Sequence, residues 1–164
     1  MIQPILTLGD PRLYDVSEPV SGDDWKHLSQ WTRDLHDTLM EYRRVYGAGR
    51  AVAAPQIGIF KRVLYMYLDK SYVFVNPVME FPDEEMYELL DDCMSFPGLM
   101  VRVRRYRRAV IRYQDETGSA GEMALEGDLA ELLQHEYDHL DGILATMRAV
   151  DNKAFVLGQM KRQF

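Results

Sequence analysis

The chain has 164 residues, of which 47% are hydrophobic and 27% are charged, and its formal net charge is −7. This length suits one domain with its own core, and the composition is ordinary for a soluble globular protein. The acidic balance gives no indication of DNA binding, and no apolar run approaches the roughly 18 residues of a membrane span. We therefore expect a single domain over residues 1–164 that binds neither DNA nor membrane.

The N-terminal segment and the cysteine content indicate the compartment. The opening residues, MIQPILTLGD, lack the basic region and the apolar run of a secretory signal. Cys93 is the only cysteine, so no internal disulfide can form. A lone thiol fits a reducing compartment, where it is inert, catalytic or a metal ligand. We expect a cytoplasmic protein.

The first long element that the sequence predicts is an amphipathic helix over residues 23–46. Ser21 and Asp24 resemble a capping box at its start, and Gly47 suits its C-terminal end. Apolar side chains recur at steps of three, four or seven residues, at Trp25, Leu28, Leu35, Leu39, Tyr42 and Tyr46.

Antiparallel strands are expected between residues 61 and 125, where β-branched and aromatic residues are frequent. They are the segments RVLYMYL, YVFVNPVM, LMVRV and AVIRYQD, with a turn at DETG, residues 115–118. A second helix is predicted over about residues 127–141, with Gly142 as its stop, and a short helix from about residue 151. The order helix, strands, helix favours an α+β fold over repeated βαβ units.

A possible metal site appears at residues 135–139, which read HEYDH. His135 and His139 are one helical turn apart, so both rings can bind one divalent ion. A catalytic metal usually takes a third protein ligand and leaves a position for water. The chain after His139 contains no further glutamate or histidine, which excludes proteases that complete their site there. From the residues alone the third ligand remains open among Asp141, Asp151, His27, His36 and Cys93.

Three segments together resemble the signature motifs of the peptide deformylase family, in the same order and at similar spacing. They are AAPQIG at 53–58, DDCMSFPG at 91–98 and QHEYDHLDGIL at 134–144. The family patterns are G-x-G-x-A-A-P-Q, E-G-C-L-S and H-E-x-D-H. The resemblance covers roughly residues 4–145. It implies a peptide-deformylase-like α+β fold in which antiparallel strands pack around a central helix that carries HEYDH.

The resemblance also implies roles for individual residues. Cys93, His135 and His139 would hold one divalent ion, which is iron(II) in typical members, although zinc or nickel can occupy such a site. Glu136 would take a proton from water and deliver it to the leaving amine.

Two further residues would stabilise the oxyanion of the reaction. The resemblance assigns this role to the side-chain amide of Gln56 and the backbone N–H of Met94.

The sequence departs from the family pattern near the expected substrate groove. Counting back from Gln56, Ala51 takes the place of the second glycine, and Arg50 lies between the two glycine positions. We expect Arg50, Ala51 and Val52 to lie beside the bound peptide, with alanine restricting close approach. The second motif also differs, because Asp91 and Asp92 replace E-G, and Met100 stands where many members carry arginine.

Several other charged residues have candidate roles. Asp91 is a candidate acceptor for the free ring nitrogen of a metal histidine, and Asp138 is expected to be a helix-surface or structural carboxylate rather than a ligand. The sequence between 102 and 112 is rich in arginine, which indicates a solvated strand face, a contact with ribosomal RNA near nascent chains, or a contact with an anionic substrate. The residues concerned are Arg102, Arg104, Arg105, Arg107, Arg108 and Arg112.

The favoured interpretation is a metal-dependent amide hydrolase that removes formyl from formyl-methionyl nascent peptides and releases formate. One rival is a deformylase-like hydrolase with a different N-acyl substrate. A second is a non-catalytic accessory protein that keeps its metal, although such a protein needs neither Glu136 nor Gln56. A third is a peptidase with Asp151 as the third ligand.

Overall fold

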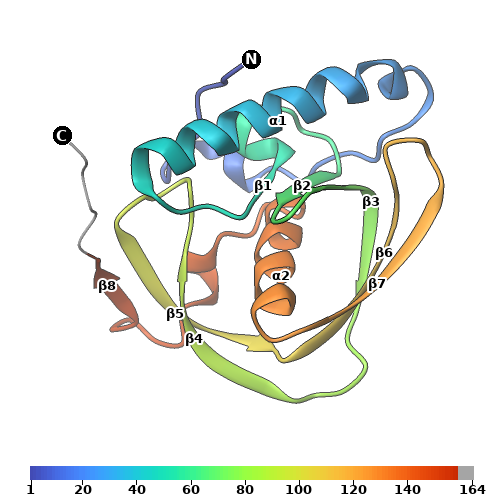
Figure 1. Ribbon diagram of the computed structural model, residues 1–164. Helices are drawn as coiled ribbons and strands as arrows, with labels where there is room; N and C mark the ends of the chain where they lie inside the picture. The colour runs from blue at the N-terminus through green and yellow to red at the C-terminus, as the bar shows by residue number, and fades with distance from the viewer. Residues whose placement is uncertain (159–164) are drawn as a thin grey trace.

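A central helix, α2 (Asp128–Leu140), carries the HEYDH sequence and lies between two antiparallel sheets (Figure 1). The structure is a computed structural model, and it describes residues 1–158. The longer helix α1 (Trp25–Tyr46) packs on the face of the larger sheet that is turned away from α2. The α+β fold expected from the sequence, with strands around the HEYDH helix, is confirmed.

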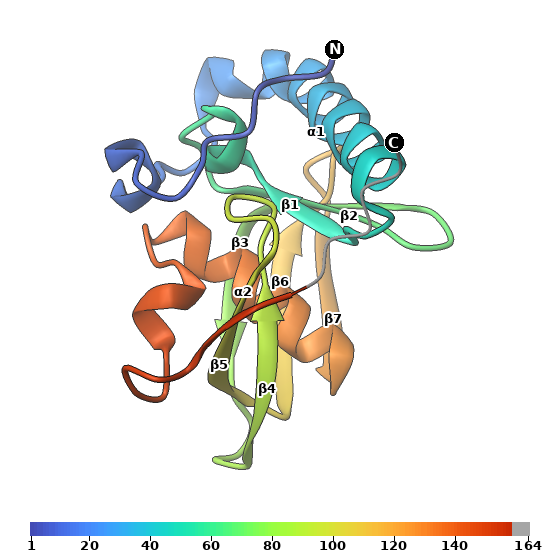
Figure 2. The same cartoon turned by 90° about the vertical axis from the view of Figure 1, so that its left-hand side faces the viewer.

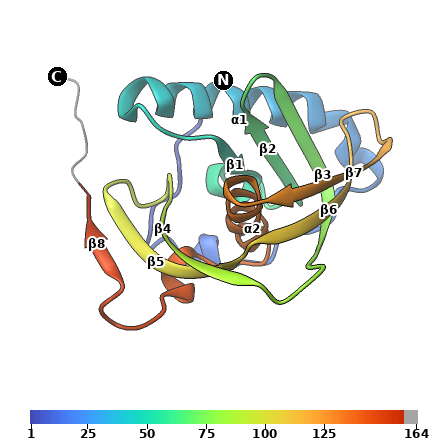
Figure 3. The same cartoon turned by 60° about the horizontal axis from the view of Figure 1, so that its bottom comes forward.

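The two sheets differ in size and position. The smaller sheet has the order β4 (Met86–Asp92), β5 (Leu99–Tyr106) and β8 (Phe155–Leu157). Figure 3 shows α2 nearly end-on, with this sheet on one side and the larger sheet on the other. The larger sheet has the order β1 (Ala51–Ala53), β2 (Val63–Tyr67), β3 (Ser71–Glu80), β6 (Arg108–Gln114) and β7 (Ala120–Glu126).

Strand β2 shows why the larger sheet needs a helix on each face. Val63 and Tyr65 pack into the cluster that contains α1, whereas Leu64 and Met66 pack into the cluster that contains α2. Successive side chains of a strand point to opposite faces, so a strand that is apolar throughout must be covered on both sides. Figure 2 shows α1 above β1 and β2, with α2 below them.

The ends of both helices follow from local sequence. The Asp24 carboxylate accepts a hydrogen bond of 3.0 Å from the Ser21 N–H, and Gly47 ends α1 with a φ of 68°. Gly142 follows α2 with a φ of 69°, and a Cβ there would lie 2.3 Å from the Tyr14 carbonyl oxygen. Glycine therefore allows the N-terminal segment to pack against the end of α2. Within the part of the chain that the structure describes, no helix is both long and apolar enough to cross a membrane.

The N-terminal segment joins two of the sequence motifs. The Leu6 N–H donates to the Gln56 carbonyl oxygen, and the Leu8 N–H donates to the Ser95 carbonyl oxygen, each at 2.8 Å. Gln56 belongs to a short 3-10 helix, Ala54–Ile57, and Ser95 follows β4. These bonds fix the separation of the two segments next to α2.

The predicted elements are confirmed in part. The helix expected over about 127–141 and the four expected strands are present, the latter as β2, β3, β5 and β6. The short helix expected from about residue 151 is wrong, because a turn there leads into β8, which pairs with Leu99–Val101 of β5. Strands β4 and β7 were not expected, since their sequences, MYELLDD and AGEMALE, are rich in residues that favour helices.

Candidate metal centre

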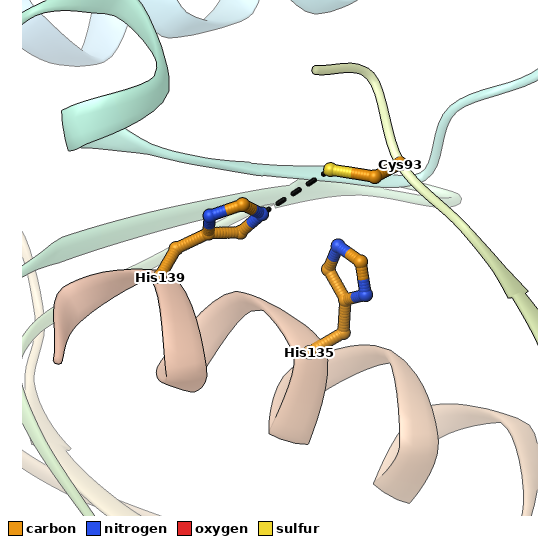
Figure 4. Close-up of side chains that lie close together, drawn as sticks. All are labelled: Cys93, His135 and His139. Atoms are coloured by element: carbon orange, nitrogen blue, oxygen red, sulfur yellow. Dashed lines mark hydrogen bonds between the residues drawn. The ribbon is translucent and has the colours of Figure 1, made fainter. Parts of the chain in front are cut away.

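Three buried side chains converge between β4 and α2 (Figure 4). Cys93 follows directly after β4, and His135 and His139 lie one turn apart on α2. One donor atom of each residue lies within 4.8 Å of the other two. The Cys93 Sγ is 3.3 Å from Nε2 of His139, and the two imidazole centroids are 5.0 Å apart.

The donor set and its spacing fit one divalent transition metal. In a tetrahedral site with bonds of about 2.0–2.3 Å, neighbouring donor atoms lie about 3.3–3.6 Å apart. The separation of 3.3 Å between Cys93 Sγ and His139 Nε2 is close to this range. A thiolate with two imidazoles is an established ligand set for zinc, iron and nickel, so the ligands alone do not choose the ion.

The other candidates for a third ligand make contacts elsewhere. His36 Nδ1 lies 2.7 Å from a tyrosine hydroxyl, and the Asp141 carboxylate accepts a hydrogen bond from an arginine. Asp151 accepts a backbone N–H in its own turn, and His27 stacks on a tryptophan. Within residues 1–158, the one group of three potential ligands is Cys93 with the two histidines of α2.

Asp91 orients one of these histidines. Its carboxylate lies 3.0 Å from Nδ1 of His135 and accepts a hydrogen bond of 2.8 Å from Arg105. Burial would raise the pKa of Asp91, but the charges of His135 and Arg105 outweigh burial and lower that pKa to about 2. The contact that the sequence suggested for Asp91 is confirmed, and it leaves Nε2 of His135 directed toward Cys93.

Arg105 links the strand side of the site to the helix side. Its side chain is 3% exposed and donates to Asp91 of β4 and to Asp138 of α2, the latter at 2.5 Å. Asp138 also accepts hydrogen bonds of 2.5 and 2.7 Å from Arg148. Asp138 is therefore a structural carboxylate, one of its expected roles, because Arg105 ties α2 to β5 and Arg148 ties it to the 3-10 helix Ala145–Arg148.

Glu136 is buried beside the three ligands. Its residue is 4% exposed, and Oε2 has no hydrogen-bond partner among the described residues. Burial is the main cause that raises the pKa of Glu136 to about 7. A buried carboxylate with an unpartnered oxygen needs a polar group or a proton from outside the chain.

Gln56 directs its amide toward the same place. Its Oε1 accepts a hydrogen bond of 2.9 Å from the Ala53 N–H, which fixes the orientation of the amide. The Nε2 then lies 3.2 Å from the Ser95 hydroxyl and 3.5 Å from Cys93 Sγ. Met94, the other expected donor, is 7% exposed and directly follows Cys93. Both residues thus lie next to the ligand sulfur.

A cavity of about 280 Å³ opens beside two of the three ligands, Cys93 and His135. Its lining includes Cys93, His135 and Glu136 as well as Arg50 and Ala51, so it connects the chemistry-bearing residues to β1. This volume is near the lower end of the range for small-molecule sites. The cavity can therefore hold a small group next to the metal ligands.

Comparison with known proteins identifies the family. A family model described as polypeptide deformylase matches residues 2–155. The chain belongs to the polypeptide deformylase family. Peptide deformylase 2 of Ralstonia nicotianae is 37% identical over 166 residues, which cover 94% of this chain and 91% of that protein. Peptide deformylase of Treponema pallidum is 38% identical over 148 residues, which cover 89% of this chain and 86% of that protein.

Solved deformylase structures agree with the fold. Peptide deformylase from Thermotoga maritima has a TM-score of 0.83 at 32% identity, covering 92% of this chain and 99% of that chain. The enzyme from Synechococcus elongatus, solved in complex with actinonin, has a TM-score of 0.83 at 30% identity. The match covers 93% of this chain and 82% of that chain. Family members are metal-dependent hydrolases, so this chain is an enzyme that fits one divalent ion at Cys93, His135 and His139.

The three residues expected beside the bound peptide occupy different environments in this deformylase. Val52 is 0% exposed, and its side chain lies in the core cluster that contains α1. Ala51 faces the opposite side of β1, where it lines the cavity, and its backbone is an ordinary strand paired with Met66. Arg50 also lines the cavity, and its guanidinium forms an ion pair of 2.8 Å with Glu131. Of the three residues, Arg50 and Ala51 therefore line the cavity, whereas Val52 does not.

The arginine-rich segment is not a uniform solvated face. Arg105 is buried. Arg104 and Arg112 form ion pairs with carboxylates on neighbouring strands, and Arg108 forms one with Asp83 in the loop before β4. These ion pairs neutralise much of the positive charge of the segment. The interpretation of this segment as a solvated strand face is therefore wrong at Arg105, which is buried.

Sequence reasoning missed two charged residues of the site. Glu131 is four residues before His135 on the same helix, and this spacing was an available signal that it lies near the metal ligands. Arg105 gave no such signal, since it is one of several arginines in its strand and its partner Asp138 is 33 residues away. Its place became apparent only from the packing of β5 on α2.

Proposed function

We propose that this member of the deformylase family hydrolyses the N-terminal formyl group of formyl-methionyl peptides and releases formate. The observation that carries the proposal is the position of Glu136, a buried carboxylate with an unpartnered oxygen next to Cys93, His135 and His139. A structural metal site needs no such carboxylate, so a non-catalytic accessory protein is not favoured. A different N-acyl substrate is not favoured either, because the relatives are named peptide deformylases.

The roles of the chain's own residues follow from their positions. When bound, a divalent ion supplies an activated water for attack on the formyl carbon. Glu136 takes the proton of that water at its unpartnered oxygen and gives it to the nitrogen of the leaving peptide amine. Nε2 of Gln56 and the N–H of Met94 donate to the formyl oxygen as negative charge develops on it.

The same proposal covers the identity of the metal ion and the cellular compartment. We expect iron(II) in the cell, with zinc or nickel able to replace it in purified protein. A cysteine ligand is open to oxidation, which supports a reducing cytoplasmic location. Residues 1–164 act as one metallohydrolase domain, an arrangement supported by the core clusters that join α2 to the larger sheet.

A contact with the ribosome through the arginine segment completes the proposal. Formylated nascent peptides emerge at the ribosome, where basic side chains meet RNA phosphates. Arg102, which is exposed and forms no ion pair within residues 1–158, is the arginine of this segment best placed to make such a contact. Binding to ribosomes that weakens with salt, and weakens further in an Arg102→Ser variant, would support this contact.

A direct assay tests the proposed activity. The protein, prepared without oxygen and loaded with one divalent ion, is incubated with formyl-Met-Ala-Ser and separately with acetyl-Met-Ala-Ser. We expect formate from the first peptide and at most traces of acetate from the second. Acetate release that equals or exceeds formate release would instead assign a broader acyl substrate.

A further inference from the structure

An ion pair forms part of the cavity wall next to the metal ligands. Arg50 precedes β1, and its carbonyl oxygen accepts a hydrogen bond of 2.9 Å from the Tyr67 N–H, which anchors its backbone to the sheet. Its Nη2 lies 2.8 Å from Oε1 of Glu131 on α2. The Glu131 side chain is 12% exposed and the Arg50 side chain 42% exposed, so the carboxylate is largely withdrawn from water while the guanidinium stays partly in contact with it.

The geometry of α2 places this pair within reach of the first side chain of a substrate. Glu131 and His135 are one turn apart on α2, a rise of about 6 Å. In a formylated peptide, the side chain of the first residue branches from the Cα atom, which is two bonds beyond the formyl carbon. When extended, this side chain spans a distance similar to the helix rise. A formyl group beside His135 and Glu136 therefore leaves that side chain within reach of Arg50 and Glu131, which line the same cavity.

The polarity of this wall is unfavourable for an apolar side chain. Among hydrogen bonds within residues 1–158, the Arg50 side chain donates only to Glu131, so its remaining N–H groups are solvated or open to a ligand. A thioether would displace water from them and offer only a weakly accepting sulfur in return. A sulfoxide has the same carbon skeleton but carries an oxygen that accepts hydrogen bonds strongly.

We propose that Arg50 and Glu131 make this deformylase prefer a polar first side chain, and that formyl-methionine sulfoxide is the natural member of that class. Oxidation of methionine adds one oxygen to the sulfur and makes the side chain polar. In the cavity, the guanidinium of Arg50 donates to the sulfoxide oxygen, while Glu131 holds the guanidinium in place. This inference rests on the proposed function, since it names the substrate class of the same site.

The test compares two ligands that differ by one oxygen atom. Dissociation constants of formyl-Met-Ala-Ser and its methionine sulfoxide form are measured by calorimetry on zinc-loaded Glu136→Gln protein, in which turnover should be slower by roughly two to four orders of magnitude. We expect the sulfoxide to bind about tenfold more tightly, the usual effect of one charge-assisted hydrogen bond. Equal binding, or tighter binding of the thioether, would overturn the proposal without any further variant.

A double variant tests the residues themselves. Arg50→Met with Glu131→Leu, in the same background, replaces the ion pair with an apolar wall, and the thioether should then bind more tightly than the sulfoxide. The matched control is Glu41→Leu with Arg44→Met, which removes an exposed ion pair of α1 and should leave the wild-type preference unchanged. An unchanged preference in the Arg50 and Glu131 variant would show that these residues do not set it.

Turnover separates this inference from the proposed function. Formate release by the zinc-loaded wild type is measured on both peptides in parallel with binding. Absence of formate from both would reject the proposed activity, while the ratio of the two dissociation constants would still decide the preference. Formate from both, with equal affinity, would keep the activity and reject the preference.

Discussion

The surroundings of Cys93 show how the fold determines the contacts of a single side chain in this site. Its sulfur lies 3.3 Å from Nε2 of His139 and receives hydrogen bonds from Gln56 Nε2 and the Ser95 N–H at 3.5 and 3.4 Å. The sulfur therefore faces one imidazole and two N–H donors in a buried place. These contacts suit an anionic thiolate that also binds a metal.

Replacement of this sulfur should remove the metal. Cys93→Ser exchanges a thiolate for a hydroxyl, which is a poor ligand for a divalent transition metal at neutral pH. We expect less than one ion per chain after dialysis, measured by elemental analysis, and a matching loss of activity. Full stoichiometry with full activity in the variant would contradict the assignment of the three ligands.

Glu136 should affect turnover but not metal content. Glu136→Gln keeps the size and polarity of the side chain but removes its capacity to accept a proton. We expect turnover to fall by roughly two to four orders of magnitude while the metal remains bound. Glu116→Gln, in the exposed turn after β6, serves as the control and should behave as wild type. Unchanged turnover of the metal-loaded Glu136→Gln protein would reject the role of the base.

Ala51 provides a prediction about the groove. Its methyl group lines the cavity from a regular strand, so glycine at this place adds space and does not relieve backbone strain. Ala51→Gly should lower KM for a formyl-methionyl tripeptide more than it changes kcat, as expected when binding of ground state and transition state changes together. Steady-state kinetics of the wild type and the variant, both loaded with the same metal, measures KM and kcat. An unchanged KM would show that the methyl group of Ala51 does not weaken substrate binding.

At the scale of elements, the site depends on how β4 and β5 pack against α2. Buried Arg105 of β5 forms ion pairs with Asp91 of β4 and with Asp138 of α2. Because Asp91 in turn contacts His135, the position of the smaller sheet determines the orientation of a metal ligand. The network therefore contributes both to the stability of the fold and to the geometry of the site.

Removal of Arg105 should destabilise the protein strongly. Arg105→Met leaves the buried Asp91 without its arginine, and the free energy of unfolding should fall by about 3–5 kcal/mol. The neighbouring Arg104→Met removes only an exposed pair with Glu88 and should cost less than about 1 kcal/mol. Urea denaturation of both variants and the wild type gives the comparison. Equal stability of the two variants would show that the buried network contributes little.

The strands also show which parts of the fold local sequence patterns do not predict. The apolar segments of β2 and β3 were predictable because β-branched and aromatic residues dominate them. In β4 and β7 the residues favour helices, and the strands form because β5 and β6 supply pairing partners along their full length. The pairing of β8 with β5 joins residues far apart in the chain, and a local pattern cannot encode such a pairing.

At the scale of the whole molecule, the sequence motifs identified the ligands, while the fold supplied the charged surroundings. The spacing of His135 and His139 predicted that their rings converge, and the resemblance added Cys93. The ion pair of Arg50 with Glu131 joins residues 81 positions apart and depends on β1 lying beside α2. That arrangement could not be read from either segment alone.

The most direct measurement of the central claim couples metal content to formate release. Metal-free protein is titrated with zinc or, without oxygen, with iron(II), and formate release from formyl-Met-Ala-Ser is recorded at each step. The assignment of Cys93, His135 and His139 to a single site predicts that activity rises in proportion to bound metal and levels off at about one ion per chain. Formate release that is independent of metal, or a fully loaded protein that releases none, would contradict it.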